Sequence, residues 1–191
     1  LEENAQLLGD YAPSDGIRKA LDEATQTWHL YRQLALSRPD REQSAELLRL
    51  AERFLAQSEA LVQEIERHSG NHAARLVNRS GRQRMLSQRI AKLYLALSWR
   101  LPVESLEQQL QQATGEFEAA QQELLGAEQN TPQIAAALQK VEAQWRFARA
   151  GFQLSADARY VPTVITTTTE TLLWQMNELT SAYAAVMQEK S

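Results

Sequence analysis

The chain has 191 residues, a formal net charge of −4, 43% hydrophobic residues and no cysteine. This length suits one domain or two small ones, and the hydrophobic content is sufficient for a folded core. The lack of cysteine excludes disulfides, iron–sulfur clusters, Cys-ligated zinc and thiol catalysis. The sequence shows no stretch long enough to span a bilayer and no signal segment, and it starts with Leu. We therefore expect a processed or trimmed chain.

The N-terminal third predicts two antiparallel helices joined by a turn at residues 37–40. The first apolar seam comprises Ile17, Leu21, Ala24, Trp28 and Tyr31, and the second comprises Leu48, Ala51, Leu55, Val62 and Ile65. Steps of three and four residues are typical of helices that bury one face. Asp40 is suited to cap the second helix. We expect a helical hairpin over residues 1–68.

The second seam continues in register, three heptads on, into a stretch that ends near Arg100. One helix over residues 41–100 would be about 90 Å long at 1.5 Å per residue. Gly70 and Gly81 disfavour so long a helix, since each costs about 1 kcal/mol. A break at residues 69–71 is the alternative, and the sequence leaves both open.

Four further seams predict a four-helix bundle over residues 69–191. They comprise Leu86, Ile90, Leu93 and Leu97; Val103, Leu106, Leu110, Ala113, Phe117, Ala120 and Leu124; Ile134, Leu138, Val141, Trp145, Ala148 and Phe152; and Ile165, Thr169, Leu172, Met176, Leu179, Tyr183 and Val186. A spacing of 3.5 residues is typical of antiparallel bundle helices. Thr131 followed by Pro132 is typical of a cap and a first helical residue. The predicted fold class is all-α, with an up-down bundle preceded by the hairpin.

An internal repeat relates the two parts at an offset of 117 residues. The matches are Leu7-Leu8-Gly9 with Leu124-Leu125-Gly126, Ile17 with Ile134, Leu21 with Leu138, and Trp28 with Trp145. Any two bundle hairpins can share leucines, but the paired tryptophans favour a duplication. The hairpin then corresponds to the second half of a unit. We expect a longer precursor to carry the first helix pair.

The charges are distributed unevenly along the chain. Between Glu66 and Glu104 there are eight basic residues and no acidic one, whereas the other residues carry a net charge of −12. Arginine makes up 16 of the 20 basic residues. Its guanidinium fork is suited to planar oxyanions. The arginines spread around the helix and the pI is about 5.5, so we expect no nucleic acid as a partner.

A second seam runs along the face opposite Leu86 and contains Val77, Gly81, Arg84, Gln88, Ala91 and Leu95. A second seam needs a second partner, and a homodimer mate is the simplest one. Two Arg84 side chains would repel each other across the interface, and an anion between them would offset that repulsion. The alternatives are an Arg84 paired with a neighbouring glutamate and a solvated basic face.

Residues 76–89, LVNRSGRQRMLSQR, resemble the signature of PilJ-type domains, the N-terminal sensory domains of type IV pilus methyl-accepting chemotaxis transducers. They are also similar to the periplasmic sensors of nitrate- and nitrite-responsive histidine kinases. The pattern of those families is approximately I-N-x-A-G-x-x-R-M-x-S-x-R. The matching positions are Asn78, Gly81, Arg84, Met85, Ser87 and Arg89. Gln88 departs from this pattern, because the nitrate sensors have Tyr at that position.

The resemblance implies a four-helix sensor in the periplasm that binds nitrate or nitrite as a homodimer and signals to a partner protein. It implies that Arg84 contacts the anion, that Gly81 admits the ligand close to the backbone, and that Asn78 or Ser87 donates a hydrogen bond. Gln88 and Arg89 complete the candidate ligand contacts. The alternative function is a structural interaction module of a pilus, chemotaxis or transport system without a small ligand.

The sequence shows no pattern for catalysis, so we do not expect an enzyme. It contains no HExxH, GxSxG or Walker loop. None of the three histidines has a glutamate three residues before it, so the di-iron pattern is missing as well. We expect no metal site and no cofactor.

Overall fold

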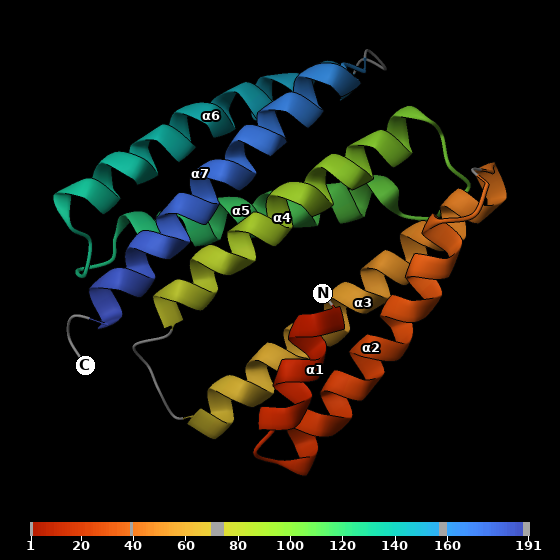
Figure 1. The fold of residues 1–191 in the computed structure, drawn as a ribbon. Coiled ribbons are helices and arrows are strands. Elements are labelled where there is room, and N and C mark those ends of the chain that lie inside the picture. Colours follow the sequence, from red (N-terminus) through yellow and green to blue (C-terminus); the bar gives the residue numbers. More distant parts are fainter. Residues whose placement is uncertain (1, 39, 70–74, 157–159, 189–191) are drawn as a thin grey trace. The chain divides into compact units, whose positions relative to one another are not determined.

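The computed structural model describes residues 2–38, 40–69, 75–156 and 160–188, and within them it has seven helices and no strand (Figure 1). The helices are α1 (Glu2–Tyr11), α2 (Asp15–Ala35), α3 (Arg41–Ser69), α4 (Arg75–Ser98), α5 (Leu106–Leu125), α6 (Pro132–Ala156) and α7 (Pro162–Gln188). The predicted all-α fold is confirmed.

The chain divides into two compact units. One comprises Leu1–His72 with Leu101–Val103, and the other comprises Ala73–Arg100 with Glu104–Ser191. The helices α3 and α4 are separate elements and belong to different units. The segment at residues 70–74, where the sequence left one helix or a break open, lies outside the described residues.

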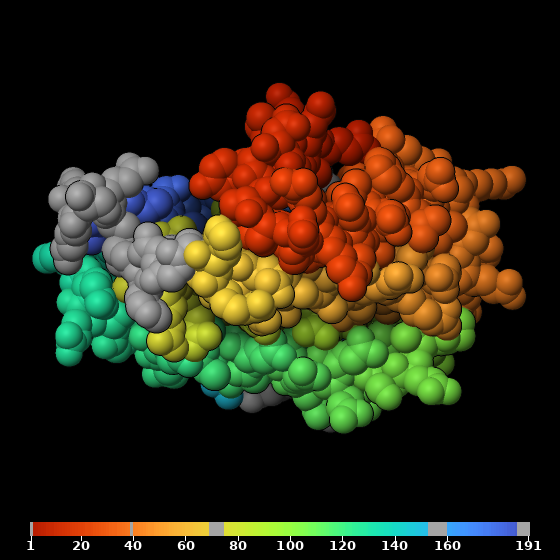
Figure 2. Space-filling view, turned by 90° about the horizontal axis from the view of Figure 1, so that it is seen from below, coloured from red at the N-terminus to blue at the C-terminus, as the bar shows by residue number. Residues whose placement is uncertain are grey.

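The first unit contains α2 and α3, which pack along each other, and the shorter α1, which packs on α2. Figure 2 shows the surface of α1 and α2 lying against that of α3. The predicted hairpin therefore lacked one helix. The break after α1 has a local cause, because Pro13 has no N–H to donate and disfavours helix at the residue before it. Ser14 then caps α2, and its hydroxyl accepts a hydrogen bond from Ile17 N at 3.3 Å.

The extra helix α1 also explains a wrong core assignment. Val62 was predicted on the α3 seam, yet it is 44% exposed, while its neighbour Leu61 is 8% exposed. Leu61 belongs to a cluster with Ala12 and Ile17, against which Ala5 of α1 packs. The end of α3 is thus covered from a direction that a two-helix hairpin would leave open.

The second unit is an antiparallel up-down bundle of α4, α5, α6 and α7 (Figure 1). The helix α4 packs against α7 and α5, α6 packs against α7, and α5 has a slighter contact with α6. The predicted seams form the core, where residues such as Leu86, Phe117, Leu138 and Leu172 are fully buried. Most residues of the predicted seams are buried, but Leu97, Phe152 and Val186 are only half-buried, and Val103 lies in the first unit, before α5 begins.

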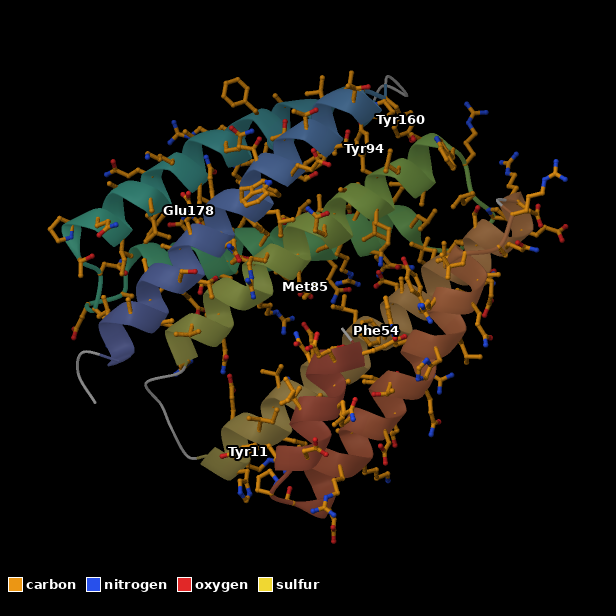
Figure 3. The ribbon with its side chains drawn as sticks, viewed as in Figure 1. Tyr11, Phe54, Met85, Tyr94, Tyr160 and Glu178 are labelled. Carbon is orange, nitrogen blue, oxygen red and sulfur yellow. The ribbon has the colours of Figure 1, made fainter. Side chains whose placement is uncertain are left out.

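Two tyrosine hydroxyls form hydrogen bonds near the two ends of α7. At one end, the backbone N–H of Val161 donates to the hydroxyl of the buried Tyr94 on α4 at 2.9 Å. Figure 3 shows Tyr94 beside Tyr160, and their ring centroids are 5.7 Å apart. At the other end, the Tyr183 hydroxyl donates to Oδ1 of Asn130, in the α5–α6 connection, at 2.6 Å. Burial raises the pKa of Tyr183 to about 12, so this donor keeps its proton at neutral pH.

The helix starts agree with the predicted repeat. Thr131 lies 117 positions after Ser14, and its hydroxyl accepts from Ile134 N at 3.2 Å, as Ser14 accepts from Ile17 N. Ile17 and Ile134 are 2% and 1% exposed, so the first core residue of each helix is buried at the same position. The helices α2 and α6 therefore begin in the same way.

Candidate functional site

The site is built on α4, whose arginines differ in their partners. Arg79 forms an ion pair with Glu123 of α5. Arg82 pairs with Glu116, also on α5, at 3.0 Å. Pairs of this kind anchor α4 to α5 and neutralise the arginines, although such exposed pairs contribute at most about 1 kcal/mol each.

Arg84 contrasts with these two arginines. Its side chain is half-buried, and no carboxylate among the described residues lies within 4 Å of it. Its Nη1 donates instead to Oδ1 of Asn177 on α7, at 2.7 Å. A guanidinium carries five N–H donors and a charge that a neutral amide does not compensate. In the described part of the chain, the alternative of an Arg84–glutamate pair therefore finds no support.

Gly81 lies one turn before Arg84 and leaves room beside it. A Cβ atom at Gly81 would meet only one atom within 4 Å, which is Nη2 of Arg84 at 3.7 Å. The Arg84 guanidinium thus folds back over the backbone of Gly81 and also reaches α7. A glycine is not needed here for the packing of this chain.

The other predicted contacts lie around Arg84 in three different settings. Gln88 is exposed and its Nε2 approaches the carbonyl of Thr169 at 3.4 Å, a weak hydrogen bond. Ser87 is fully buried and donates to the backbone carbonyl of Arg84 at 2.7 Å. Asn78 and Arg89 are half-buried. Gln88, like Arg84, hydrogen-bonds across the α4–α7 contact, whereas Ser87 is turned into the core.

The sequence placed the second seam of α4 on the face opposite the bundle core. In the structure, part of that seam contacts the bundle itself. Arg84 and Gln88 both hydrogen-bond to α7 of the same chain. A bundle helix has two neighbours, so the covered arc of α4 is wider than one seam. The helix α7 is therefore at least one partner of the second seam.

Several polar residues near the site were missed by the sequence analysis. Asn177 contacts Arg84 across 93 residues of sequence. In the core, Gln83 and Gln121 are 0% and 1% exposed and donate to the carbonyls of Phe117 and Leu138. Their Oε1 atoms have no partner in the described part of the chain. Gln83 lies three residues after Ser80, and Gln121 lies four residues after Phe117, so helical spacing places both on the core face. The seams used for the prediction included mainly apolar residues and therefore left these glutamines out.

The described residues hold no group of three or more His, Asp or Glu side chains that could bind a metal ion. One of the three histidines, His72, lies outside these residues. No helix in the described part of the chain is long and apolar enough to cross a membrane. Within the described residues, Arg84 thus lies between two helices of an up-down bundle without a carboxylate partner, and such bundles build their ligand sites from side chains on neighbouring helices.

The comparisons with known proteins give the family. The family model for PilJ, the N-terminal domain of type IV pili methyl-accepting chemotaxis transducers, matches residues 67–167. The match covers more than half of the chain, including α4, α5, α6 and the start of α7. The chain belongs to the PilJ family, a family of non-catalytic sensor and signalling domains. No match was found among curated proteins or among solved structures.

Proposed function

We propose that this chain is an extracytoplasmic sensor domain that binds a small oxyanion, nitrate or nitrite, at Arg84 and passes a signal to a partner protein. One observation carries the proposal. Arg84 is half-buried and has no carboxylate partner in the described part of the chain, while Arg79 and Arg82 on the same helix have one each.

The chemistry of Arg84 suits a planar anion. A guanidinium offers parallel N–H donors that match two oxygens of a nitrate, nitrite or carboxylate group. The residues from 67 to 103 include no aspartate or glutamate, so α4 itself carries no carboxylate that would compete with an anion. A Cβ atom at Gly81 would meet only Nη2 of Arg84 within 4 Å, so no other described side chain crowds the guanidinium at that point.

A homodimer would complete the site as the family resemblance suggests. Val77, Gly81 and Leu95 on α4 are half-buried and mostly apolar or small. Two α4 helices meeting here would bring two positive charges together, and an anion between them would lower the cost of that approach. Sedimentation with and without nitrate tests this part, since anion-dependent dimerisation is expected.

The anion site is tested by calorimetric titration with nitrate, nitrite and chloride. We expect the wild-type protein to bind nitrate or nitrite, and Arg84→Ala to bind at least about 30-fold more weakly, because the charged donor is lost. Arg84→Lys keeps the charge without the fork and should be intermediate. Arg75→Ala, which removes an exposed arginine of the same helix, is the matched control and should remain within about twofold of wild type.

A second pair of variants separates the site from the fold. Gly81→Ala and Gly115→Ala place a methyl group where only Arg84 Nη2, or nothing, lies within 4 Å. Both should stabilise their helices by up to about 1 kcal/mol. Only Gly81→Ala should weaken anion binding. The proposal fails if wild type binds none of the three anions, or if Arg84→Ala binds them as tightly as wild type.

The alternative, a docking module without a small ligand, has one observation in its favour. Trp174 on α7 and Phe147 on α6 are 71% and 67% exposed. Large exposed aromatic side chains are enriched where proteins bind each other. A chain that binds no anion and stays monomeric at high concentration would favour this function.

A further inference from the structure

Asn177 brings a second helix to the site. It lies on α7, is exposed, and accepts the hydrogen bond from Nη1 of Arg84 at 2.7 Å. The bond joins two helices whose contact is extensive and lies within one unit of the chain. Asn177 is outside residues 67–167, which the family model matches.

The orientation of the Asn177 amide follows from its partner. An arginine can only donate, so the amide must turn its oxygen toward Arg84 and its NH2 group elsewhere. Among the described residues, none accepts a hydrogen bond from that NH2 group. The two side chains therefore place unused N–H donors of a guanidinium next to two N–H donors of an amide.

We propose that Asn177 is a second anion contact, so that one oxyanion is held by Arg84 from α4 and by the Asn177 amide N–H from α7. This inference rests on the proposed function and adds a residue and a helix to it. An oxyanion offers only acceptors, which is what two neighbouring donor groups require. The oxygen of Asn177 holds the guanidinium in place while its nitrogen donates to the ligand.

This arrangement makes the anion a link between α4 and α7 of the same chain. An occupied site would restrain the two helices relative to each other, because the ligand contacts both. A ligand changes a conformational equilibrium only through its different affinity for the two states. A ligand that contacts both helices has a different affinity for each arrangement of α4 and α7. A ligand that contacts α4 alone would have the same affinity whatever the position of α7.

The test uses two variants of Asn177 that both remove the amide N–H donor, one of which also adds a negative charge. Asn177→Asp has nearly the same shape, cannot donate, and adds a carboxylate beside Arg84, so nitrate and nitrite binding should fall by about 30-fold or more. Asn177→Ala removes the donor and the hydrogen bond to Arg84, so binding should weaken by about tenfold. Thr163→Asp adds the same charge at an exposed position 14 residues earlier on α7, about 21 Å away at 1.5 Å per residue, and should change the affinity by about twofold at most.

Thermal unfolding accompanies each titration and shows that the variants fold. Asn177→Asp should unfold at or above the temperature of wild type, since it gains an ion pair with Arg84, and the gain should vanish in the Arg84→Ala background. The inference is overturned if wild type binds an anion while Asn177→Ala binds it equally tightly, or if Asn177→Asp retains binding. A wild-type protein that binds no anion overturns the proposed function and this inference together.

Discussion

The hairpins α2–α3 and α6–α7 follow the same local rules at an offset of 117 residues, yet their surroundings differ. Both first helices start at a hydroxyl cap, and Ile17 and Ile134 are buried to the same extent. The leucines of the shared Leu-Leu-Gly motif differ, because Leu7 is 64% exposed and Leu124 is fully buried. Equivalent residues are buried only where enough helices surround them.

The second difference is chemical. In the second unit, α4 lies beside α7 and brings buried polar residues such as Ser80, Gln83 and Ser87. In the first unit, α3 packs on α2, and no helix equivalent to α4 is among the described helices of that unit. The predicted repeat relates the two hairpins, while the candidate site depends on the helix that packs next to one of them. This separation of scaffold and site is common among folds.

The paired tryptophans should show the largest difference between the units. Trp145 is 2% exposed, its ring centroid is 4.3 Å from that of Phe117, and its Nε1 donates to Glu118 at 3.1 Å. Trp28 is only half-buried. Trp145→Ala should lower the free energy of unfolding by about 3–5 kcal/mol, and Trp28→Ala by roughly 2 kcal/mol. Urea denaturation followed by circular dichroism measures both, and equal losses would contradict the difference in packing.

An intermediate effect is expected at high pH, and only in the second unit. Tyr183 titrates at about 12 instead of 10.0 because it is buried, so the folded state disfavours its ionised form. Its contribution to stability is complete below pH 10 and is lost as the pH rises toward 12. Tyr183→Phe should remove this part of the alkaline decline, at the cost of about 1 kcal/mol at neutral pH for the lost hydrogen bond to Asn130. An unchanged decline in the variant, measured by denaturation at a series of pH values, would refute the assignment.

The smallest effect should be equal in the two units. Ser14→Ala and Thr131→Ala each remove a hydroxyl that caps a helix through the N–H of the third residue after it. Each should cost about 1 kcal/mol in the free energy of unfolding. Thr131→Ser and Ser14→Thr serve as matched controls, because they preserve the hydroxyl cap. A loss confined to one of the two helices would weaken the structural equivalence of the repeat.

Much of the fold could be predicted from the sequence because the signals of a helix, its apolar spacing and its caps, lie within a few residues of each other. The seams in α5, α6 and α7, the cap at Thr131 and the start of α3 after Asp40 all depend on residues within a few turns. The helix α1 was missed, since the first predicted seam began at Ile17 and no separate seam was assigned to the residues before Pro13. Its presence in turn changed which residue of α3, Leu61 or Val62, is buried.

The candidate site could be predicted only in part, because its residues are far apart in the sequence. The sequence singled out Arg84 from its own helix, but its partner Asn177 is 93 residues away. Which residue of α7 faces Arg84 depends on the relative position of two long helices along each other. A shift of one residue would rotate a different side chain into that place. The neutral side chain of Asn177 also carries no charge pattern that would have suggested it.

The hydroxyls of Tyr94 and Tyr183 restrict how α7 can move. One holds the N–H of Val161 just before α7 begins, and the other joins the last part of α7 to Asn130. Sliding α7 along its axis would stretch both bonds, and each joins groups that are at least partly shielded from water. Turning α7 about its axis would also carry the Tyr183 hydroxyl, at the end of a long side chain, away from Asn130. The two bonds therefore oppose both a piston stroke and a rotation of α7, and a small tilt about its hydrogen-bonded ends is the motion that strains them least.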